Sequence, residues 1–421
     1  MRYVGSEVDR LRRVVVKTPG TALASMLPEH IHPGSDGYLL FDDLVHVPSA
    51  QEEHAQLAAV LGSAAQVLDL DDLLLAALED APLRRRLIPE IAQLEDLSGP
   101  MMRRLGGLDA PELALALVAG VVGGESVMHP LPNLLFARDL AAVVGPLLVL
   151  GAASKKARRR ESLITEAIAT HSPYLCEGPM ASRAHLQSAR GARYPLTVEG
   201  GDVLVVSPSV ALIGASERTS WAMILHLAED LATHGIEQVL VVEMPKQRSS
   251  MHLDTVFTFV DRDKAVVYEP ILRRGDPEEC SVIRLELSAG PVRIAPVDGD
   301  LVSALAQVGH PVTAIPCGQG DPIAERREQW TDGANFVALA PGIVVGYARN
   351  NRTAKALEAH GFECWMAESY LEMLERDFGG DFDALVASGR KLAIHIEGHE
   401  LSRGRGGPRC LTMPLLREKG A

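Results

Sequence analysis

Aromatic residues are few in this sequence, and it has no excess of positive charge. Phe, Trp and Tyr make up 4% of the 421 residues, and 41 Lys and Arg face 55 Asp and Glu, which gives a net charge of -14 with His neutral. A chain with this charge is not expected to have nucleic acid as its main partner. A cationic substrate would be attracted to it, although only weakly at cellular salt.

Long apolar runs and cysteine pairs are also missing. The longest apolar stretches, near 113–122 and 140–153, are shorter than the ~20 residues that a membrane-spanning helix needs. Residues 1–7 contain no apolar core of a secretory signal. The cysteines are odd in number and widely spaced, and none forms a C-x-x-C pair: Cys176, Cys280, Cys317, Cys364 and Cys410. We therefore expect no disulfide framework and no zinc site, and a reducing, cytoplasmic location.

What the sequence does contain is an alternation of hairpin signals and single helices. A hydrophobic content of 47% allows a large core. Paired apolar runs flank turn residues at 203–206 and 210–214, 256–260 and 265–268, and 336–339 and 343–347. We also expect strands at 11–17 and 238–243, and helices at 49–61, 220–234 and 353–360. This rhythm predicts an α/β protein built from small pseudo-repeats of mixed sheet and helix, arranged around an axis.

Residues 71–119 have a different texture, dominated by Leu and Ala with few β-branched residues. Pro82, Pro89 and Pro111 stand where helices could begin. Asp109 and the pair at 71–72 are plausible N-caps. We predict three or four short helices that form an insertion.

The stretch 404–414 places Cys410 after a loop rich in glycine and arginine. Arginines raise the local electrostatic potential, which favours a thiolate and hence a nucleophile. An inert, buried cysteine beside a surface turn is an equally good interpretation of this stretch alone. A nucleic-acid-binding RGG segment is a weaker one, because the motif occurs once and leads into apolar sequence.

Ionisable residues hemmed by small or apolar neighbours mark further candidates. His252 and Asp254 are two residues apart, so on an extended strand both would project from one face as an acid/base group beside an anion. A core histidine beside a surface aspartate is the alternative, and the absence of a nearby third His or Cys ligand disfavours a metal. The segment 199–202, Glu-Gly-Gly-Asp, is either a tight turn or a carboxylate site that a cation can approach.

Other charged segments have a structural interpretation when taken singly. Arg138 and Asp139 would form a surface ion pair, and 330–335 is rich in turn formers. The basic run 155–161 would begin a helix with mostly solvated charges. Arg218, beside a helix cap, would serve a carboxylate or pair with a neighbour.

The order and wording of these segments together resemble the arginine deiminases of the guanidino-group-modifying (pentein) superfamily. The matching segments reach across nearly the whole chain: 132–139, 199–202, 214–219, 251–257, 329–335, 341–350 and 404–414. The resemblance implies a five-fold pseudosymmetric α/β propeller. It implies one catalytic domain over 1–421, interrupted by a helical insertion at 71–122.

The resemblance also implies roles for individual residues. Asp139 and Asp254 would hold a planar guanidinium while Cys410 attacks its carbon. His252 would protonate the leaving ammonia and then activate water, with Glu199 holding His252 in its protonated form. No metal and no organic cofactor is implied.

The same resemblance assigns the amino-acid end of the substrate. Arg158 and Arg218 would bind its carboxylate, with Asn133 and the backbone of Phe136 nearby. Arg405, in the glycine loop, would control access and bias the thiol. One departure is Ala137, which stands where the family has a threonine.

The expected reaction is hydrolysis of L-arginine to L-citrulline and ammonia. The expected partners are that small molecule and further copies of the chain in a homo-oligomer, with no nucleic acid and no membrane. Three alternatives stay open: amidino transfer to an amine, hydrolysis of another guanidine such as agmatine, and a catalytically inactive binding protein.

Overall fold

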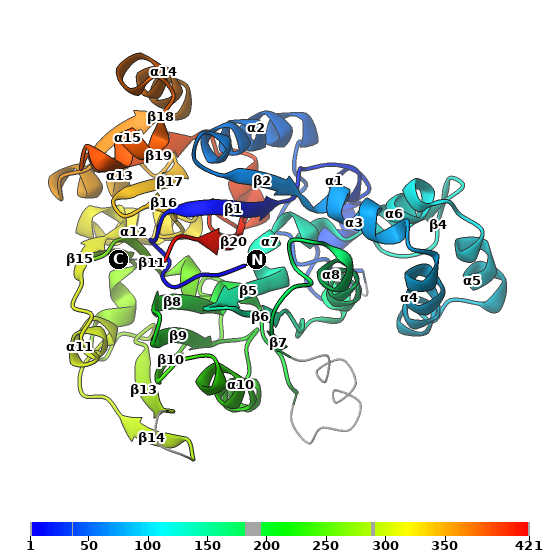
Figure 1. Ribbon diagram of the computed structural model, residues 1–421, viewed down its shortest axis with the longest axis horizontal. Helices are drawn as coiled ribbons and strands as arrows, with labels where there is room; N and C mark the ends of the chain where they lie inside the picture. Colours follow the sequence, from blue (N-terminus) through cyan, green and yellow to red (C-terminus); the bar gives the residue numbers. More distant parts are fainter. Residues whose placement is uncertain (1, 36, 182–194, 288–290, 420–421) are drawn as a thin grey trace.

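Five three-stranded units recur in the computed structural model, which describes residues 2–35, 37–181, 195–287 and 291–419 (Figure 1). In each unit an antiparallel pair of strands is followed by a helix and by a third strand, which pairs in parallel with the second strand of the pair. In four of the units the antiparallel pair is a hairpin. The fold class is therefore mixed α/β, and the rhythm predicted from the sequence is present.

The bounds of these units follow the chain. The first three are β5 (Ala141–Val144), β6 (Leu147–Leu150), α8 (Arg159–His171) and β7 (Met180–Ala181); β8 (Val203–Ser207), β9 (Val210–Ala215), α10 (Trp221–Thr233) and β10 (Gln238–Glu243); and β11 (Phe257–Asp261), β12 (Lys264–Val267), α11 (Leu301–Gln307) and β15 (Thr313–Pro316). In the second unit, β13 (Ser281–Glu286) and β14 (Arg293–Pro296) extend the sheet beyond β10.

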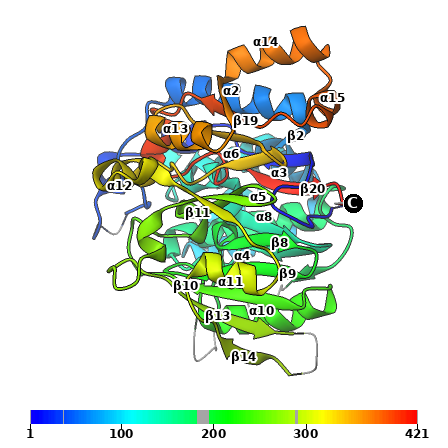
Figure 2. The same cartoon turned by 90° about the vertical axis from the view of Figure 1, so that its left-hand side faces the viewer.

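The fourth and fifth units complete the chain. The fourth has β16 (Val337–Ala340), β17 (Ile343–Tyr347), α13 (Asn351–Ala359) and β19 (Leu392–Ile396), with β18 (Glu363–Met366), α14 (Ala367–Phe378) and α15 (Phe382–Ala387) added before β19. The fifth joins the two ends of the chain, because β20 (Met413–Arg417) pairs antiparallel with β1 (Leu11–Val16), and β2 (Gln66–Asp69) follows α2 (Val47–Ala64). Helix α14 packs on α2 at the outer edge (Figure 2).

The predicted strands, hairpins and helices of these units are confirmed to within a few residues. The predicted end of α2 before Gly62 was wrong. The helix runs on to Ala64, because Leu61 and Ala64 on its inner face continue the buried stripe.

Four helices fill the stretch after β2 and lie at the periphery of the molecule (Figure 1): α3 (Leu70–Leu78), α4 (Ala81–Leu94), α5 (Gly99–Gly106) and α6 (Ala110–Ala119). Asp109 caps α6 as expected, but α3 is capped by Asp69, whose side chain accepts from the amide of Asp71. Pro89 lies inside α4 rather than at a helix start. Across the described ranges, no helix is long and apolar enough to cross a membrane.

Short elements complete the described structure: α1 (Thr21–Ala24), α7 (Ala137–Leu140), α12 (Pro322–Trp330), β3 (Val121–Val122), β4 (Glu125–Ser126) and the 3₁₀ helices η1 (Pro28–Ile31), η2 (Pro132–Leu135), η3 (Lys156–Arg158), η4 (Gly200–Asp202), η5 (Leu253–Thr255), η6 (Glu269–Leu272), η7 (Cys317–Gly320) and η8 (Leu401–Gly404). Three of them, α7, η4 and η5, directly precede the first strand of a unit. These three turns pack against one another in sequence order, α7 on η4 and η4 on η5. The chain thus gathers short polar turns where its units meet.

Close packing of these turns requires glycine at two adjacent positions. A Cβ on Gly200 would overlap the carbonyl oxygen of Arg138 and lie 2.9 Å from that of Ala141. A Cβ on Gly201 would lie 2.8 Å from Cγ of His252. The Glu-Gly-Gly-Asp motif therefore lets η4 approach both α7 and the segment before η5.

We expect Gly200→Ala to lower the free energy of unfolding by about 1–3 kcal/mol, because the added methyl group meets rigid backbone. Gly62→Ala is the matched control. It lies in a helix with open space around its Cβ, so it should stabilise the protein by about 0.4–1 kcal/mol. Denaturant unfolding measures both values, and equal effects of the two variants would contradict the packing argument.

Candidate active site

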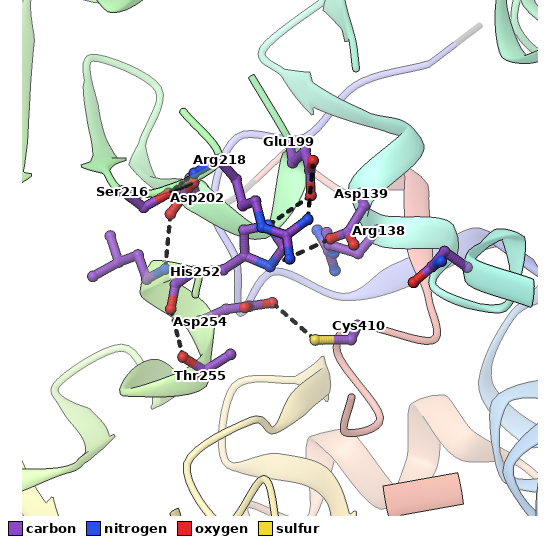
Figure 3. Close-up of polar contacts among 12 residues, drawn as sticks. Arg138, Asp139, Glu199, Asp202, Ser216, Arg218, His252, Asp254, Thr255 and Cys410 are labelled. Atoms are coloured by element: carbon purple, nitrogen blue, oxygen red, sulfur yellow. Dashed lines mark hydrogen bonds and ion pairs between the residues drawn. The ribbon is translucent and has the colours of Figure 1, made fainter. Parts of the chain in front are cut away.

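The Cys410 thiol lies beside a buried carboxylate contributed by a distant turn. Its sulfur is 3.6 Å from Oδ2 of Asp254 (Figure 3). Its backbone N–H donates to Oδ1 of Asn335 at 3.0 Å. The glycine loop that leads to it packs closely, because a Cβ on Gly406 would overlap the ring of Phe136. Cys410 is 3% exposed, as in the alternative interpretation of an inert, buried cysteine, but it lies beside other reactive groups.

Arg409 forms a buried ion pair with Asp254. The Arg409 guanidinium donates to Oδ2 of Asp254 at 2.7 Å and to Oε2 of Glu7 at 3.0 Å. Asn335 donates from its side chain to the backbone carbonyl of Asp254 at 2.9 Å. Oδ1 of Asp254 has no hydrogen-bond partner among the described residues.

The sequence did not assign a role to three of these residues. Arg409 adjoins Cys410, so its position was a signal, but nothing in the sequence showed that it would point at Asp254. Asn335 was interpreted as a turn residue. Glu7 gave no signal at all.

His252 lies between two acidic side chains. Its Nε2 is 2.9 Å from Oε2 of Glu199, and its Nδ1 is 3.7 Å from Oδ1 of Asp139 (Figure 3). Burial by itself would lower the pKa of His252, but Asp139, the hydrogen bond to Glu199 and the charge of Asp202 raise it to about 9. The ring is therefore cationic at neutral pH in the empty site.

The sequence spacing predicted that His252 and Asp254 project from one face of a strand, and this prediction was wrong. His252 precedes the 3₁₀ helix η5, which contains Asp254. Asp202 fixes this turn, because its Oδ1 accepts from the backbone N–H of Leu253 at 2.9 Å and its Oδ2 accepts from Ser216 at 2.6 Å. Burial raises the pKa of Asp202 to about 6, against the lowering effect of His252.

Arg158 bridges three buried carboxylates. Its Nη1 donates to Asp139 at 2.7 Å and to Glu199 at 2.9 Å, and its Nε donates to Glu161 at 2.9 Å. Arg218 adds a longer contact of 3.8 Å to Oε1 of Glu199. Burial would raise the pKa of Glu199, but Arg158, Arg218 and His252 together hold it well below its ordinary value.

Two predictions about charged segments were wrong. Arg138 and Asp139 do not form a surface ion pair, because both are buried in α7 and Arg138 packs against the backbone of Arg409. The basic run 155–161 is not mainly solvated either. Arg160 is buried and donates to Glu95 and to the carbonyl of Leu117, which ties the insertion to α8.

The thiol does not have the lowered pKa that the neighbouring arginines had suggested. Burial raises the pKa of Cys410 well above its ordinary value, and Asp254, Asp139 and Asp332 raise it further. Arg409 acts in the opposite direction but is outweighed. Cys410 is therefore a neutral thiol in the empty site.

These side chains surround a pocket with about 350 Å³ of space, part of it open to solvent. Its walls include eight of the ten residues predicted for the site: Asn133, Phe136, Asp139, Arg158, Arg218, His252, Arg405 and Cys410. The other two do not line the pocket. Glu199 contacts the lining residue His252, and Asp254 contacts the lining residue Cys410. Leu40, Arg248, Met251, Thr255 and Gly404 complete the lining and were not predicted.

Arg405 lies at the pocket wall in a left-handed backbone conformation, with φ of 66°. Its guanidinium carbon is 3.6 Å from the centre of the Trp330 ring, an arrangement that stabilises a cation over an aromatic face. Its Nη2 reaches the carbonyl oxygens of Arg248 and Ser249 at 3.4 Å.

Asp139, Glu199 and His252 have the donor types of a metal site, with ligand atoms within 4.8 Å of one another. The sequence argument against a metal had considered only nearby His and Cys ligands. In the structure, the Arg158 cation already contacts both carboxylates, so the charge that a metal would neutralise is largely balanced.

Comparison with solved structures agrees with this fold. The N-terminal domain of ArgZ bound to product, described as an arginine dihydrolase from the ornithine-ammonia cycle in cyanobacteria, superposes with a TM-score of 0.52 at 14% identity, covering 97% of this chain and 98% of that one. SxtG, an amidinotransferase from Microseira wollei, gives 0.54 at 13% identity, covering 100% and 99%. At these identities the likeness shows the mixed α/β fold alone.

Comparison of sequences is more specific. A protein named arginine deiminase from Listeria monocytogenes serotype 4a (strain HCC23) is 34% identical over 443 residues, covering 99% of this chain and 97% of the relative. One of the same name from Bacillus thuringiensis subsp. konkukian (strain 97-27) is 33% identical, covering 99% and 98%. The family model described as arginine deiminase matches residues 109–417. The chain belongs to the arginine deiminase family.

Proposed function

We propose that this chain hydrolyses L-arginine to L-citrulline and ammonia through a covalent thiouronium on Cys410. The observation that carries the proposal is one pocket lined by Cys410, His252 and Asp139, with Asp254 beside the sulfur. Asp139 and Asp254 each keep one oxygen without a hydrogen-bond partner among the described residues, and two such oxygens suit a planar cation with several N–H donors. The names of the sequence relatives support the same substrate.

The first half of the reaction begins with charge neutralisation. A bound guanidinium adds a positive charge beside Asp139 and Asp254, two of the carboxylates that raise the pKa of Cys410. As the guanidinium binds, the Cys410 thiol releases its proton to solvent, and the resulting thiolate attacks the guanidinium carbon and forms a C–S bond. His252 gives its proton to the leaving nitrogen, the C–N bond breaks, and neutral ammonia departs.

The second half uses the same histidine as a base. Neutral His252 takes a proton from water while the water oxygen bonds to the thiouronium carbon. The C–S bond then breaks, the sulfur leaves as a thiolate, and the proton that remains on the new oxygen passes to the sulfur and restores the Cys410 thiol. Glu199 keeps the imidazole oriented through Nε2, which leaves Nδ1 facing Asp139 for both proton transfers.

The amino-acid end of arginine would lie toward Arg218, Asn133 and the backbone of Phe136. We propose Arg218 as the main partner of the substrate carboxylate. Arg158 is a secondary partner, because two of its three nitrogens already contact carboxylates and Nη2 reaches only the Asn133 carbonyl at 3.4 Å. Arg405, at the wall beside Cys410, would control access.

We further propose that the five units form a five-fold pseudosymmetric propeller and that 1–421 is one catalytic domain interrupted by 71–122. The repeated strand pattern supports both statements.

Five free cysteines support a cytoplasmic location. We also propose that the chain forms a homo-oligomer, which sedimentation velocity would test.

Cys410→Ser should abolish citrulline formation, by on the order of 10³-fold or more, because a serine hydroxyl is a far weaker nucleophile here. Thermal unfolding should stay close to that of the parent. Cys176→Ser, at an exposed position, is the control and should retain full activity. Citrulline release by Cys410→Ser at the parent rate would remove Cys410 from the mechanism.

The His252 ring should titrate near pH 9 in the empty protein, well above its unperturbed value. Histidine-selective NMR measures this midpoint, and Glu199→Gln should lower it because the hydrogen-bonded anion is lost. Since the folded-state pKa exceeds the unfolded value, the stabilisation from protonated His252 is complete below about pH 6.5 and is lost as the pH rises through about 9. A midpoint at or below the unperturbed value would contradict the assigned pairing.

Arg218→Ala should raise KM for L-arginine by roughly 10- to 100-fold, because one charge-assisted contact to the substrate carboxylate is lost. Its effect on agmatine, which has no carboxylate, should be small. Arg159→Ala is the control, since Arg159 is exposed in the same basic run as Arg158. Citrulline and carbamoylputrescine assays give both constants, and equal losses on the two substrates would refute the role.

A further inference from the structure

A second pocket adjoins Arg158, and Cys410 is not part of its lining. It has about 190 Å³ of space, part of it open to solvent, and we call it the rear pocket. Its lining is Asp139, Leu140, Gly151, Ala153, Arg158, Glu161, Ser162 and Glu199. It shares Asp139 and Arg158 with the pocket that holds Cys410, so the two pockets meet at these side chains.

Two buried carboxylates in the wall of the rear pocket have hydrogen-bonding capacity that neither the substrate nor a neighbour uses fully. Glu161 and Glu199 are 2% and 1% exposed. Oε1 of each accepts no hydrogen bond from the described residues, although that of Glu199 lies 3.8 Å from Nη1 of Arg218. Buried acceptors left without a donor are costly, so small molecules with O–H or N–H donors fit this wall. Burial raises the pKa of Glu161 to about 7 despite Arg158, so Glu161 can also donate to water.

In the proposed reaction, bound substrate blocks the opening of the pocket that holds Cys410, which we call the front pocket. Arginine enters it with its guanidinium toward Cys410, and its aliphatic chain and amino-acid end then fill the opening. The reaction must nevertheless release one ammonia and admit one water while the rest of the substrate stays covalently attached. Both events occur at Nδ1 of His252, which faces Asp139, the residue common to both pockets.

We propose that the rear pocket binds water and ammonia and exchanges them with the reaction centre while the substrate occupies the front pocket. This proposal rests on the function proposed above. His252 gives the leaving nitrogen its third hydrogen as the C–N bond breaks, and ammonia then moves past Arg158 toward Glu161 and Glu199, which accept hydrogen bonds from its N–H groups. Water moves in the opposite direction, gives one proton to His252 and supplies the new C–O bond. No oxidant, metal or further reactant is needed.

Ala153 offers a way to narrow the rear pocket without touching the acid groups. It is partly exposed and lines the rear pocket but not the front pocket. Gly151 is unsuitable, since a Cβ there would lie 2.5 Å from the carbonyl oxygen of Asp139. Ala153→Leu fills the space, Ala153→Ser is the matched small control, and Ala153→Val is the fallback if the leucine variant does not fold.

Two rates and one affinity test the proposal. With Ala153→Leu we expect the rate of citrulline formation and the rate of incorporation of ¹⁵N from labelled ammonium into arginine each to fall by about 10-fold, because both need passage through the rear pocket. The Kd for arginine, measured in a Cys410→Ser background, should change by less than about 2-fold, since arginine binds from the front. Ala153→Ser should keep both rates.

Unchanged rates in a folded Ala153→Leu or Ala153→Val variant would overturn the proposal, as would losses matched by an equal loss of arginine affinity. Failure of the proposed function itself gives a different result. In that case the parent protein forms no citrulline and incorporates no ¹⁵N, and mass spectrometry of acid-quenched parent protein finds no adduct on Cys410.

Discussion

The arrangement of this site depends on two buried arginines that each hold carboxylates from distant parts of the chain. Arg158 joins Asp139, Glu161 and Glu199, and Arg409 joins Glu7 and Asp254. An isolated buried carboxylate would give up its charge through a raised pKa, and pairing with arginine opposes this: the pKa of Glu199 is held well below its ordinary value, although burial still raises that of Glu161 to about 7. On Asp139 and Asp254 the arginines bind only Oδ2. Oδ1 of each has no hydrogen-bond partner among the described residues, which suits recognition of a cation with several N–H donors.

Repetition of one structural unit brings these charges together. Asp139, Asp202 and Asp254 belong to α7, η4 and η5, short turns that precede the first strand of three successive units. Each turn therefore delivers its acid to an equivalent place, where neighbouring units pack. Cys410 arrives just before β20, the first strand of the unit that also contains β1 and so joins the chain ends. A site assembled in this way needs no single long loop, and its precision comes from the packing of sheets and of glycines at the closest contacts.

The sequence revealed those parts of the site that local composition records. Hairpin and helix signals placed the units, and the motifs around His252 and Cys410 identified groups that the structure brings into one pocket. The sequence did not predict those parts of the site whose conformation depends on contacts with residues far away in the chain. The spacing of His252 and Asp254 predicted a strand face, but Asp202 holds the segment as a 3₁₀ turn. No local pattern shows that Glu7 meets Arg409, because that contact spans nearly the whole chain. Burial sets the ionisation and the partners of such charged groups, and burial is a property of the folded molecule.

The ionisation of Cys410 shows how the same charge balance serves chemistry. Arginines near it in sequence suggested a thiolate, yet Arg405 points toward Trp330 and Arg409 is occupied by Glu7 and Asp254. Three carboxylates then outweigh the remaining positive charge, and the thiol keeps its proton. The deficit at this point is one of positive charge, and in the proposed reaction a guanidinium bound to Asp139 and Asp254 would supply it. A nucleophile controlled in this way would become reactive when a ligand of the right charge and shape arrives, and a thiol without that ligand would resist alkylation and oxidation. Under the proposed function, substrate selection and activation of the sulfur would thus follow from the same electrostatic arrangement.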